Sequence, residues 1–248
     1  GGVGTYSYQW YNSLTNTAIT GATSLNYTPS TANVGTLSYY CIISQNGLAC
    51  SVTSSLVSVQ VVAVPSVSTQ PLASQTVCLN GAPVNLFISL SNGTGTPTYQ
   101  WYSNTVNALG GTSISGATAI TYTPLTTATG TIYYYCIATY ANGGCGTVST
   151  NIAEVIVNPL PVVNDVTIVQ CDDDLDAITA FNLTVNNAQI SVDAANETFT
   201  YYTSLAGASA NPAFDLITTP LAFTNTTPTL MYIWTRVTTV NGCYRVAK

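Results

Sequence analysis

Hydrophobic and polar residues alternate through the middle of the chain, and short runs rich in Asn, Gly and Pro interrupt the alternation. Alternation with a period of two predicts strands that turn one face toward a core. The expected strands cover residues 67–72, 84–90, 98–103, 119–123, 131–139 and 147–157.

The alternation also predicts which side chains face the core. In the second of these strands they are Val84, Leu86, Ile88 and Leu90, and in the fifth they are Ile132, Tyr134, Cys136 and Ala138. The turn Asn142-Gly143-Gly144 is expected to join the last two strands, because these residues accept positive φ.

Two of the expected strands carry an aromatic signature. Trp101 lies in the strand 98–103, and Tyr134 and Cys136 follow as Tyr-x-Cys in the strand 131–139. In an immunoglobulin-like sandwich the Trp fills the core, the Tyr fastens the corner before its strand, and the Cys packs against the Trp. The signature occurs once before, with Trp10 and with Cys41 in Tyr39-Tyr40-Cys41. The predicted fold class is therefore all-β, as tandem immunoglobulin-like antiparallel β-sandwiches arranged head to tail, with Trp10, Trp101, Tyr134 and Cys136 as core residues.

An internal repeat defines the domain organisation. Cys41 and Cys136 stand 95 residues apart, as do Cys50 and Cys145, so the two signatures belong to two copies of one unit. Boundaries are expected at the proline-containing junctions, which gives units over 1–64, 65–160 and 161–248. The first unit lacks a counterpart of the first two strands and is expected to be N-terminally truncated. The third is a diverged sandwich that we expect to be C-terminally truncated.

The third unit keeps the layout of the others without a visible repeat. It has an early Cys171, an alternating strand with Phe181, Leu183 and Val185, and an aromatic strand with Phe199 and Tyr201. A late strand with Met231, Ile233, Thr235 and Val237 is expected to turn at Asn241-Gly242-Cys243.

Charge is scarce and concentrated in the last third of the chain. Of the 248 residues only 5% are charged, the formal net charge is −6, and Glu154 is the only charged residue before Asn164. Nucleic acid and anionic membrane surfaces require a basic face, so neither is expected as a partner. The chain has no His, which removes the usual general base and metal ligand and argues against an enzyme. No apolar run is long enough for a membrane span, so membrane insertion is not expected, and an export signal would lie outside this chain.

The motifs resemble those of a known group of repeats. Thr69-Gln70-Pro71, Gln75-Thr76-Val77-Cys78, the strand around Trp101 and Tyr133-Tyr134-Tyr135-Cys136 look like the tandem immunoglobulin-like repeats of very large cell-surface proteins in the Bacteroidetes. The third unit, with Cys171-Asp172-Asp173-Asp174 ahead of Phe181-Asn182-Leu183, resembles a repeat of the same proteins. The resemblance implies export by the type IX secretion route to the bacterial cell surface. It also implies a role as an adhesin or stalk, as in gliding motility.

Seven cysteines in an exported chain predict disulfides. Cys171 and Cys243 are the only two in the third unit, so we expect them to pair. By position they correspond to Cys78 and Cys145, the first choice in the second unit, which leaves Cys136 as a free thiol beside Trp101. The alternative pairs Cys136 with Cys145 and, in the first unit, Cys41 with Cys50.

One acidic cluster is the candidate metal site. Asp172, Asp174 and Asp176 could offer three carboxylates to Ca²⁺ from one loop, at every second position. The glycine that gives known calcium loops their sharp turn is absent, and no Glu closes the loop. We therefore favour a solvated acidic turn over a calcium site, and expect no other cofactor.

Tyrosines are the candidate ligand-binding residues. Alternation places Tyr102, Tyr133 and Tyr135, with Tyr11 and Tyr40 of the first copy, on the outward face, where they could contact a surface polysaccharide. The leading hypothesis is a structural or binding segment of an extended surface adhesin or stalk, with neighbouring repeats of the same polypeptide and a cell-surface ligand as partners. The alternative is a spacer or carbohydrate-binding accessory region of a large secreted enzyme.

Overall fold

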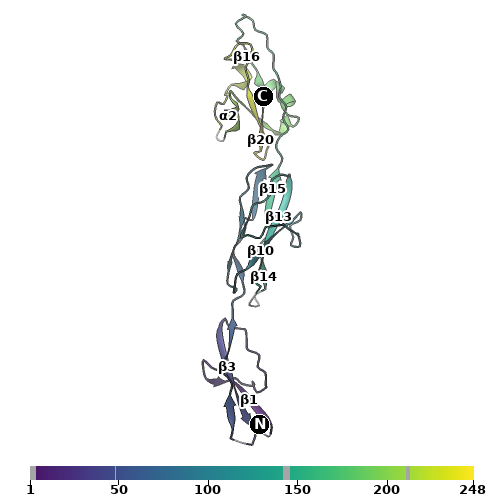
Figure 1. Cartoon of the computed structure of the whole chain (residues 1–248). Helices are drawn as coiled ribbons and strands as arrows, with labels where there is room; N and C mark the ends of the chain where they lie inside the picture. Colours follow the sequence, from purple (N-terminus) through teal and green to yellow (C-terminus); the bar gives the residue numbers. More distant parts are fainter. Residues whose placement is uncertain (1–3, 48, 142–145, 211–212) are drawn as a thin grey trace.

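A computed structural model describes residues 4–47, 49–141, 146–210 and 213–248 of the chain. Its strands form three units that follow one another along a rod, with the N-terminus at one end (Figure 1). We call residues 4–64 unit 1, residues 65–160 unit 2 and residues 161–248 unit 3. Nearly all regular structure is β and most strand pairs are antiparallel, so the expected class of tandem immunoglobulin-like sandwiches is confirmed.

Unit 2 contains both layers of a sandwich. One layer is a sheet in the order β11-β10-β13-β15-β7, with β14 also paired to β13, and the other is made of the pairs β6–β9 and β8–β12. The strands are β6 Ser66–Thr69, β7 Ser74–Cys78, β8 Leu86–Phe87, β9 Ser89–Ser91, β10 Thr98–Asn104, β11 Thr112–Ser113, β12 Thr121–Tyr122, β13 Gly130–Thr139, β14 Thr147–Ser149 and β15 Ala153–Asn158.

The signature residues of unit 2 occupy its core. Trp101 and Cys136 lie opposite each other on β10 and β13, and both are fully buried. The indole Nε1 of Trp101 donates to the carbonyl of Ala119 at 2.9 Å, which satisfies the polar atom of this buried ring. The hydroxyl of Tyr134 forms a hydrogen bond with the backbone of Leu125. Burial, followed by the nearby Tyr122, raises the pKa of Tyr134 to about 12.

Two expectations for the first half of unit 2 are wrong. The expected strand 67–72 ends at Thr69, ahead of Pro71, which cannot donate to a ladder. This strand, β6, pairs with β9 in one layer, whereas the following strand, β7, pairs with β15 in the other. Val84 is 60% exposed rather than inward, because its amide and carbonyl bond the side chain of Gln75 before the strand begins at Leu86.

Unit 1 has the same strand register as unit 2, but its core residues are less buried. Its sheet has the order β2-β1-β3-β4 with β5 also on β3. Trp10 lies opposite Cys41, but Trp10 is only partly buried, so it is a weaker core residue than predicted. The strands are β1 Tyr6–Asn12, β2 Thr17–Ala18, β3 Gly35–Gln45, β4 Ser51–Thr53 and β5 Val57–Val61.

Unit 3 combines a three-stranded sheet, in the order β17-β19-β20, with a second layer of short strands and short helices. Tyr201 of β17 lies opposite Thr235 of β19, in the same register as Trp101 of β10 and Cys136 of β13 in unit 2. The elements are β16 Ala180–Phe181, η1 Leu183–Asn186, α1 Asn187–Ile190, η2 Ala194–Asn196, β17 Thr198–Tyr202, α2 Leu205–Ser209, η3 Pro220–Ala222, β18 Phe223–Thr224, β19 Trp234–Thr238 and β20 Tyr244–Ala247.

Two expected strands of unit 3 are shorter than predicted. The strand through Phe181 and Val185 ends after Phe181, because the side chain of Asn182 accepts the amide of Thr184 and begins the turn of η1. The late strand begins at Trp234, and residues 226–233 ahead of it are irregular. Among the described residues, no helix is long and apolar enough to cross a bilayer.

Candidate functional site

A disulfide crosses the junction between units 2 and 3. Cys78 ends β7, where it lies beside Asn158 at the end of β15, the point at which the chain leaves unit 2. Cys243 is buried in the turn between β19 and β20 of unit 3. Their Sγ atoms are 2.03 Å apart and their Cα atoms 5.5 Å apart, with a sequence separation of 165 residues. The two units are therefore joined by the backbone and by a second covalent link.

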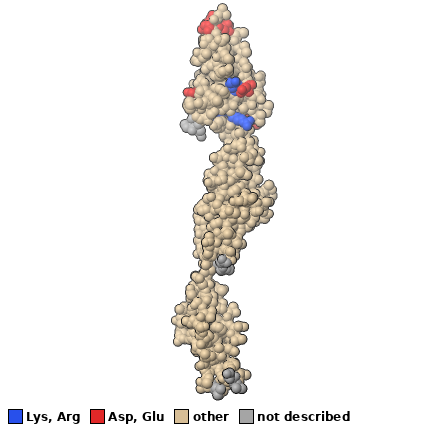
Figure 2. Space-filling model, viewed as in Figure 1, with Lys and Arg blue, Asp and Glu red and all other residues tan. Residues whose placement is uncertain are grey.

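This bond contradicts the expected pairs. Cys171 cannot pair with Cys243, which is bonded to Cys78, and Cys171 is an exposed free thiol. Its loop lies at the opposite end of unit 3 from unit 2, where Figure 2 shows the acidic side chains gathered. Cys78 is equally unable to pair with Cys145. Cys145 and the turn Asn142-Gly143-Gly144 lie outside the described residues.

The alternative pairs are not formed among the described cysteines. Cys41 is a free thiol that points into the core from β3, whereas Cys50 is free and exposed just before β4. Cys136 is also a free thiol beside Trp101. Burial raises the pKa of the Cys136 thiol to about 11, so it stays protonated and unreactive at neutral pH.

The acidic loop brings its three predicted carboxylates together. Oxygens of Asp172, Asp174 and Asp176 lie within 4.8 Å of one another. Each carboxylate also accepts a backbone amide of its own loop: Asp172 from Ala177 at 2.6 Å, Asp174 from Asp176 at 3.4 Å and Asp176 from Ile178 at 2.7 Å. These bonds hold the loop through Leu175 and Ala177, which both have positive φ.

The carboxyl groups of this loop have different electrostatic surroundings. The amide of Ala177, which donates to Asp172, lowers the pKa of that carboxyl. The amide of Asp176 lowers the pKa of Asp174, but the neighbouring carboxyl groups of Asp172 and Asp176 outweigh it and raise the pKa above its ordinary value. This arrangement fits a self-capped acidic turn, and calcium binding stays a prediction.

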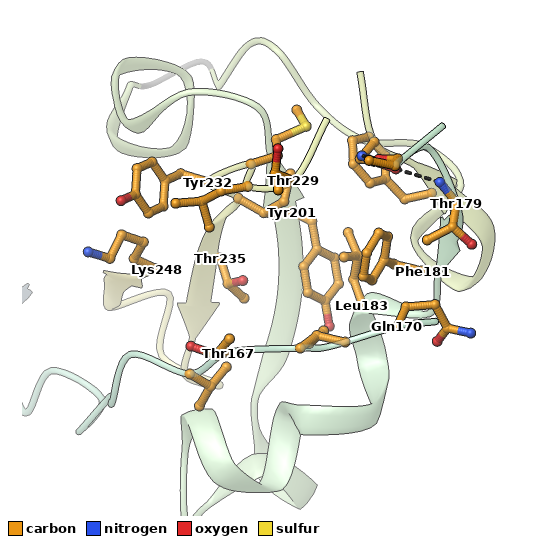
Figure 3. Close-up of a pocket in the computed structure, with 18 of the residues that line it drawn as sticks. Thr167, Gln170, Thr179, Phe181, Leu183, Tyr201, Thr229, Tyr232, Thr235 and Lys248 are labelled. Carbon is orange, nitrogen blue, oxygen red and sulfur yellow. Dashed lines mark hydrogen bonds between the residues drawn. The ribbon is translucent and has the colours of Figure 1, made fainter. Parts of the chain in front are cut away.

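A cavity of about 550 Å³ opens in unit 3 (Figure 3). Phe181, Leu183 and Tyr201 lie in its interior, and the irregular segments 166–170 and 229–233 form two of its sides. Lys248 lies at one end, with its Nζ 5.0 Å from the ring centre of Tyr232. Sequence reasoning missed this cavity, because it depends on where two segments without regular structure lie.

The outward tyrosines form stacked pairs rather than an open platform. Tyr102 and Tyr135 stack with ring centres 5.1 Å apart, and Tyr11 and Tyr40 of unit 1 do the same. Tyr135 is only 2% exposed, because the loop before β11 covers it and the amides of Gly110 and Gly111 donate to its hydroxyl. Tyr133 donates instead to Glu154. The expected glycan contact through Tyr135 is therefore not available in this structure.

Comparison with known families accounts for two of the units. Residues 167–248 match the Flavobacterium inter-domain disulphide bond domain. Residues 67–159 match a family described as a domain of unknown function (DUF8696). The first match agrees with the bond observed between Cys78 and Cys243 and indicates an origin in the Bacteroidetes.

Several solved structures share a partial likeness. The three N-terminal domains of the highly immunogenic outer capsid protein of bacteriophage RB49 are 18% identical, over 62% of this chain and 57% of theirs, with a TM-score of 0.41. The fibronectin(III)-like modules of Clostridium thermocellum CbhA are 15% identical over 62% of this chain and 78% of theirs, with a TM-score of 0.30. Sidekick-1 immunoglobulin domains 1–5 are 11% identical over 98% of this chain and 54% of theirs, with a TM-score of 0.31. No curated protein matches.

Two of these structures extend well beyond the match, since this chain spans a little over half the length of the solved three-domain segment of the capsid protein and of the solved Sidekick-1 chain. With TM-scores of 0.41 and lower, these likenesses support no inference about function. The chemistry of the chain's own residues, above all the Cys78–Cys243 bond, carries the functional argument.

Proposed function

We propose that this chain is a segment of an extended bacterial cell-surface adhesin or stalk, in which disulfides couple successive immunoglobulin-like units. The bond between Cys78 and Cys243 carries this proposal, because it acts on the geometry between units rather than on the fold of either one. Disulfides persist in oxidising compartments outside the cytosol, which supports an extracellular location.

The physical effect of the bond is to restrict the hinge at the junction. The units are linked by a short segment with Pro159 and Pro161, which is already stiff. The disulfide adds a second attachment between the units, so bending or twisting at the junction must displace the backbone segment and the disulfide together. Closing a loop of 165 residues also stabilises the folded pair by roughly 5 kcal/mol in the chain-entropy model.

Two free cysteines, Cys50 and Cys171, occupy positions in their units that resemble those of Cys243 and Cys78. The carbonyl of Cys50 accepts the amide of Gln45, the last residue of β3, and the carbonyl of Cys243 accepts the amide of Thr239, the first residue after β19. Cys171 follows residues 166–170 near the start of unit 3, as Cys78 ends β7 in the first half of unit 2. Both thiols are exposed, Cys50 in unit 1 and Cys171 in unit 3, which are the first and last units along the rod.

These positions favour neighbouring repeats of the same polypeptide as the partners of Cys50 and Cys171. Each link would form when two thiols lose two protons and pass two electrons to a disulfide-carrying oxidoreductase, whose disulfide is reduced to two thiols. A rod of covalently coupled units would hold its far end away from the cell, where it could meet a surface polysaccharide or another cell-surface ligand. Export by the type IX route and a part in gliding motility belong to the same proposal.

Labelling of intact cells tests the surface location. Antibodies raised against this chain should stain unpermeabilised cells of the source bacterium, and brief protease treatment of the cells should remove the signal. A periplasmic marker serves as the control for leakage. Staining that requires permeabilisation would contradict the proposal.

A further inference from the structure

The cavity of unit 3 lies where unit 2 has a strand. In unit 2, β15 lies between two partners: it runs antiparallel to the first half of β13 and parallel to β7. Ala153, Val155 and Val157 of β15 point into the core and are buried. The strand therefore joins the two halves of the sheet and fills the sandwich between them.

The described residues of unit 3 include both partner segments but no strand between them. Residues 229–233 precede β19 as the first half of β13 precedes Cys136, and residues 166–170 correspond to β7 at the start of the unit. Within the described part of unit 3, neither segment takes part in a strand pair, and together they line the cavity of about 550 Å³. Their less exposed side chains are Val166, Ile168, Met231 and Ile233, which alternate as strand residues do.

The end of β20 leads into this cavity. Ala247 pairs with Thr235, and Lys248 then begins to leave β19 and contact the early segment of the unit. The amide of Lys248 donates to Asp165 Oδ1 at 2.8 Å, as the amide of Asn151 in unit 2 donates to Gln70 Oε1 at 2.8 Å. Lys248 therefore corresponds to Asn151, which stands two residues before β15.

From this correspondence we propose that the cavity is the acceptor site of a β-strand, supplied by the residues that follow Lys248 in the parent polypeptide. The strand runs antiparallel to residues 229–233 and parallel to residues 166–170. Its alternate side chains are apolar and replace the cavity with packed core above Leu183 and Tyr201. A cavity of this size and polarity would otherwise suggest a small-molecule site.

Unit 2 supplies the probe for this proposal. Its segment 152–158, Ile-Ala-Glu-Val-Ile-Val-Asn, is added directly after Lys248, so that the register of Asn151 with its own strand is preserved. One control extension has seven Gly and Ser residues. A second control keeps the length but replaces the two valines at the buried positions with Asp. Thermal unfolding and amide hydrogen exchange are measured for each chain, together with its mass in solution.

The extended chain should remain monomeric and unfold at a higher temperature than both controls. The amides of residues 167–169 and 230–233 should exchange at roughly a tenth of the rate seen in the controls, or more slowly still. Equal exchange in all three chains would overturn the proposal. Protection that appears only in a dimer would also overturn it, because the strand would then come from a second molecule. Binding of the free heptapeptide to the chain without an extension, and loss of that binding in the chain that carries the extension, would support the same site.

Discussion

Cys78 and Cys243 belong to different sandwiches, yet their Cα atoms lie only 5.5 Å apart across the junction of units 2 and 3. The end of β7 and the turn after β19 meet there because β7 runs parallel to β15 and so ends where the chain enters the next unit. A cysteine at this edge faces forward along the rod, and a cysteine in the turn of the next unit faces back.

Removal of this bond should loosen the junction without unfolding either unit. In the double variant C78S/C243S, spin labels in units 2 and 3 should give a broader distance distribution than in the parent chain, because only the backbone link remains. The variant C171S is the matched control, since Cys171 is exposed and unpaired. Equal distributions in both variants would mean that the bond does not set the geometry.

Arg236 should matter for unit 3 through hydrogen bonds rather than through an ion pair. Its guanidinium donates to the carbonyls of Ala208 and Ala210 at the end of α2, and it lies 4.2 Å from the ring centre of Tyr244. R236A should therefore lower the free energy of unfolding by about 2 kcal/mol, because these carbonyls lose a charged donor. The matched variant R245A changes an exposed arginine and should leave stability nearly unaltered. A similar loss in both, measured by chemical denaturation, would contradict this role.

Tyr135 should be needed for the loop that covers it. Its hydroxyl accepts the amides of Gly110 and Gly111, both at 3.0 Å. Y135F removes this acceptor while keeping the ring stacked on Tyr102, and should cost about 1 kcal/mol and speed exchange at the two glycine amides. Y40F is the comparison in unit 1, where the hydroxyl bonds Asn16 instead. Unchanged exchange at Gly110 and Gly111 in Y135F would show that the loop holds without this bond.

Two carboxyl groups of the acidic loop, those of Asp172 and Asp174, should titrate in a fixed order. The amide of Ala177 lowers the pKa of Asp172, so the stabilisation is present above the unfolded pKa near 3.8 and is lost as the pH falls through the lower folded value. The pKa of Asp174 is raised despite its own amide bond, because of its carboxylate neighbours. Carboxyl-carbon NMR should therefore show Asp172 titrating at a lower pH than Asp174.

The same spectra test the calcium hypothesis. If the loop only caps its own amides, Ca²⁺ should leave the carboxyl shifts of Asp172, Asp174 and Asp176 unchanged. A concerted shift of all three at micromolar Ca²⁺ would establish a site. The reverse titration order would contradict the hydrogen bonding seen in the loop.

Local sequence patterns predict the sandwich well and the links between units poorly. The strands of Trp101 and Cys136 can be predicted from the sequence, because the register of a strand pair is set by alternation and by the residues of its turn. The partner of Cys78 cannot be found in this way, since it depends on which end of the unit β7 reaches after the break at Pro71. The sequence pattern pairs Cys171 with Cys243 inside one unit, because position along the chain does not reveal at which end of the unit each cysteine lies.

The short elements of unit 3 depend on single side chains. Asn182 reads as a strand residue between Phe181 and Leu183, but its carbonyl oxygen accepts the amide of Thr184 and starts a helical turn. Such competition between side-chain and ladder hydrogen bonds is decided by tertiary packing, which alternation does not report. Alternation predicts the face on which the stacked tyrosines lie, but Tyr135 is covered by a loop whose path the sequence does not define.

A disulfide map of the chain, prepared without reduction, tests the central claim most directly. Free thiols are alkylated in the native state, the chain is then cleaved by chymotrypsin, and the linked peptides are identified by mass. We expect a peptide containing Cys78 linked to one containing Cys243, with Cys50 and Cys171 of the isolated chain alkylated and Cys41 and Cys136 protected by burial. A link from Cys78 to Cys145, or from Cys171 to Cys243, would contradict the covalent coupling of units 2 and 3.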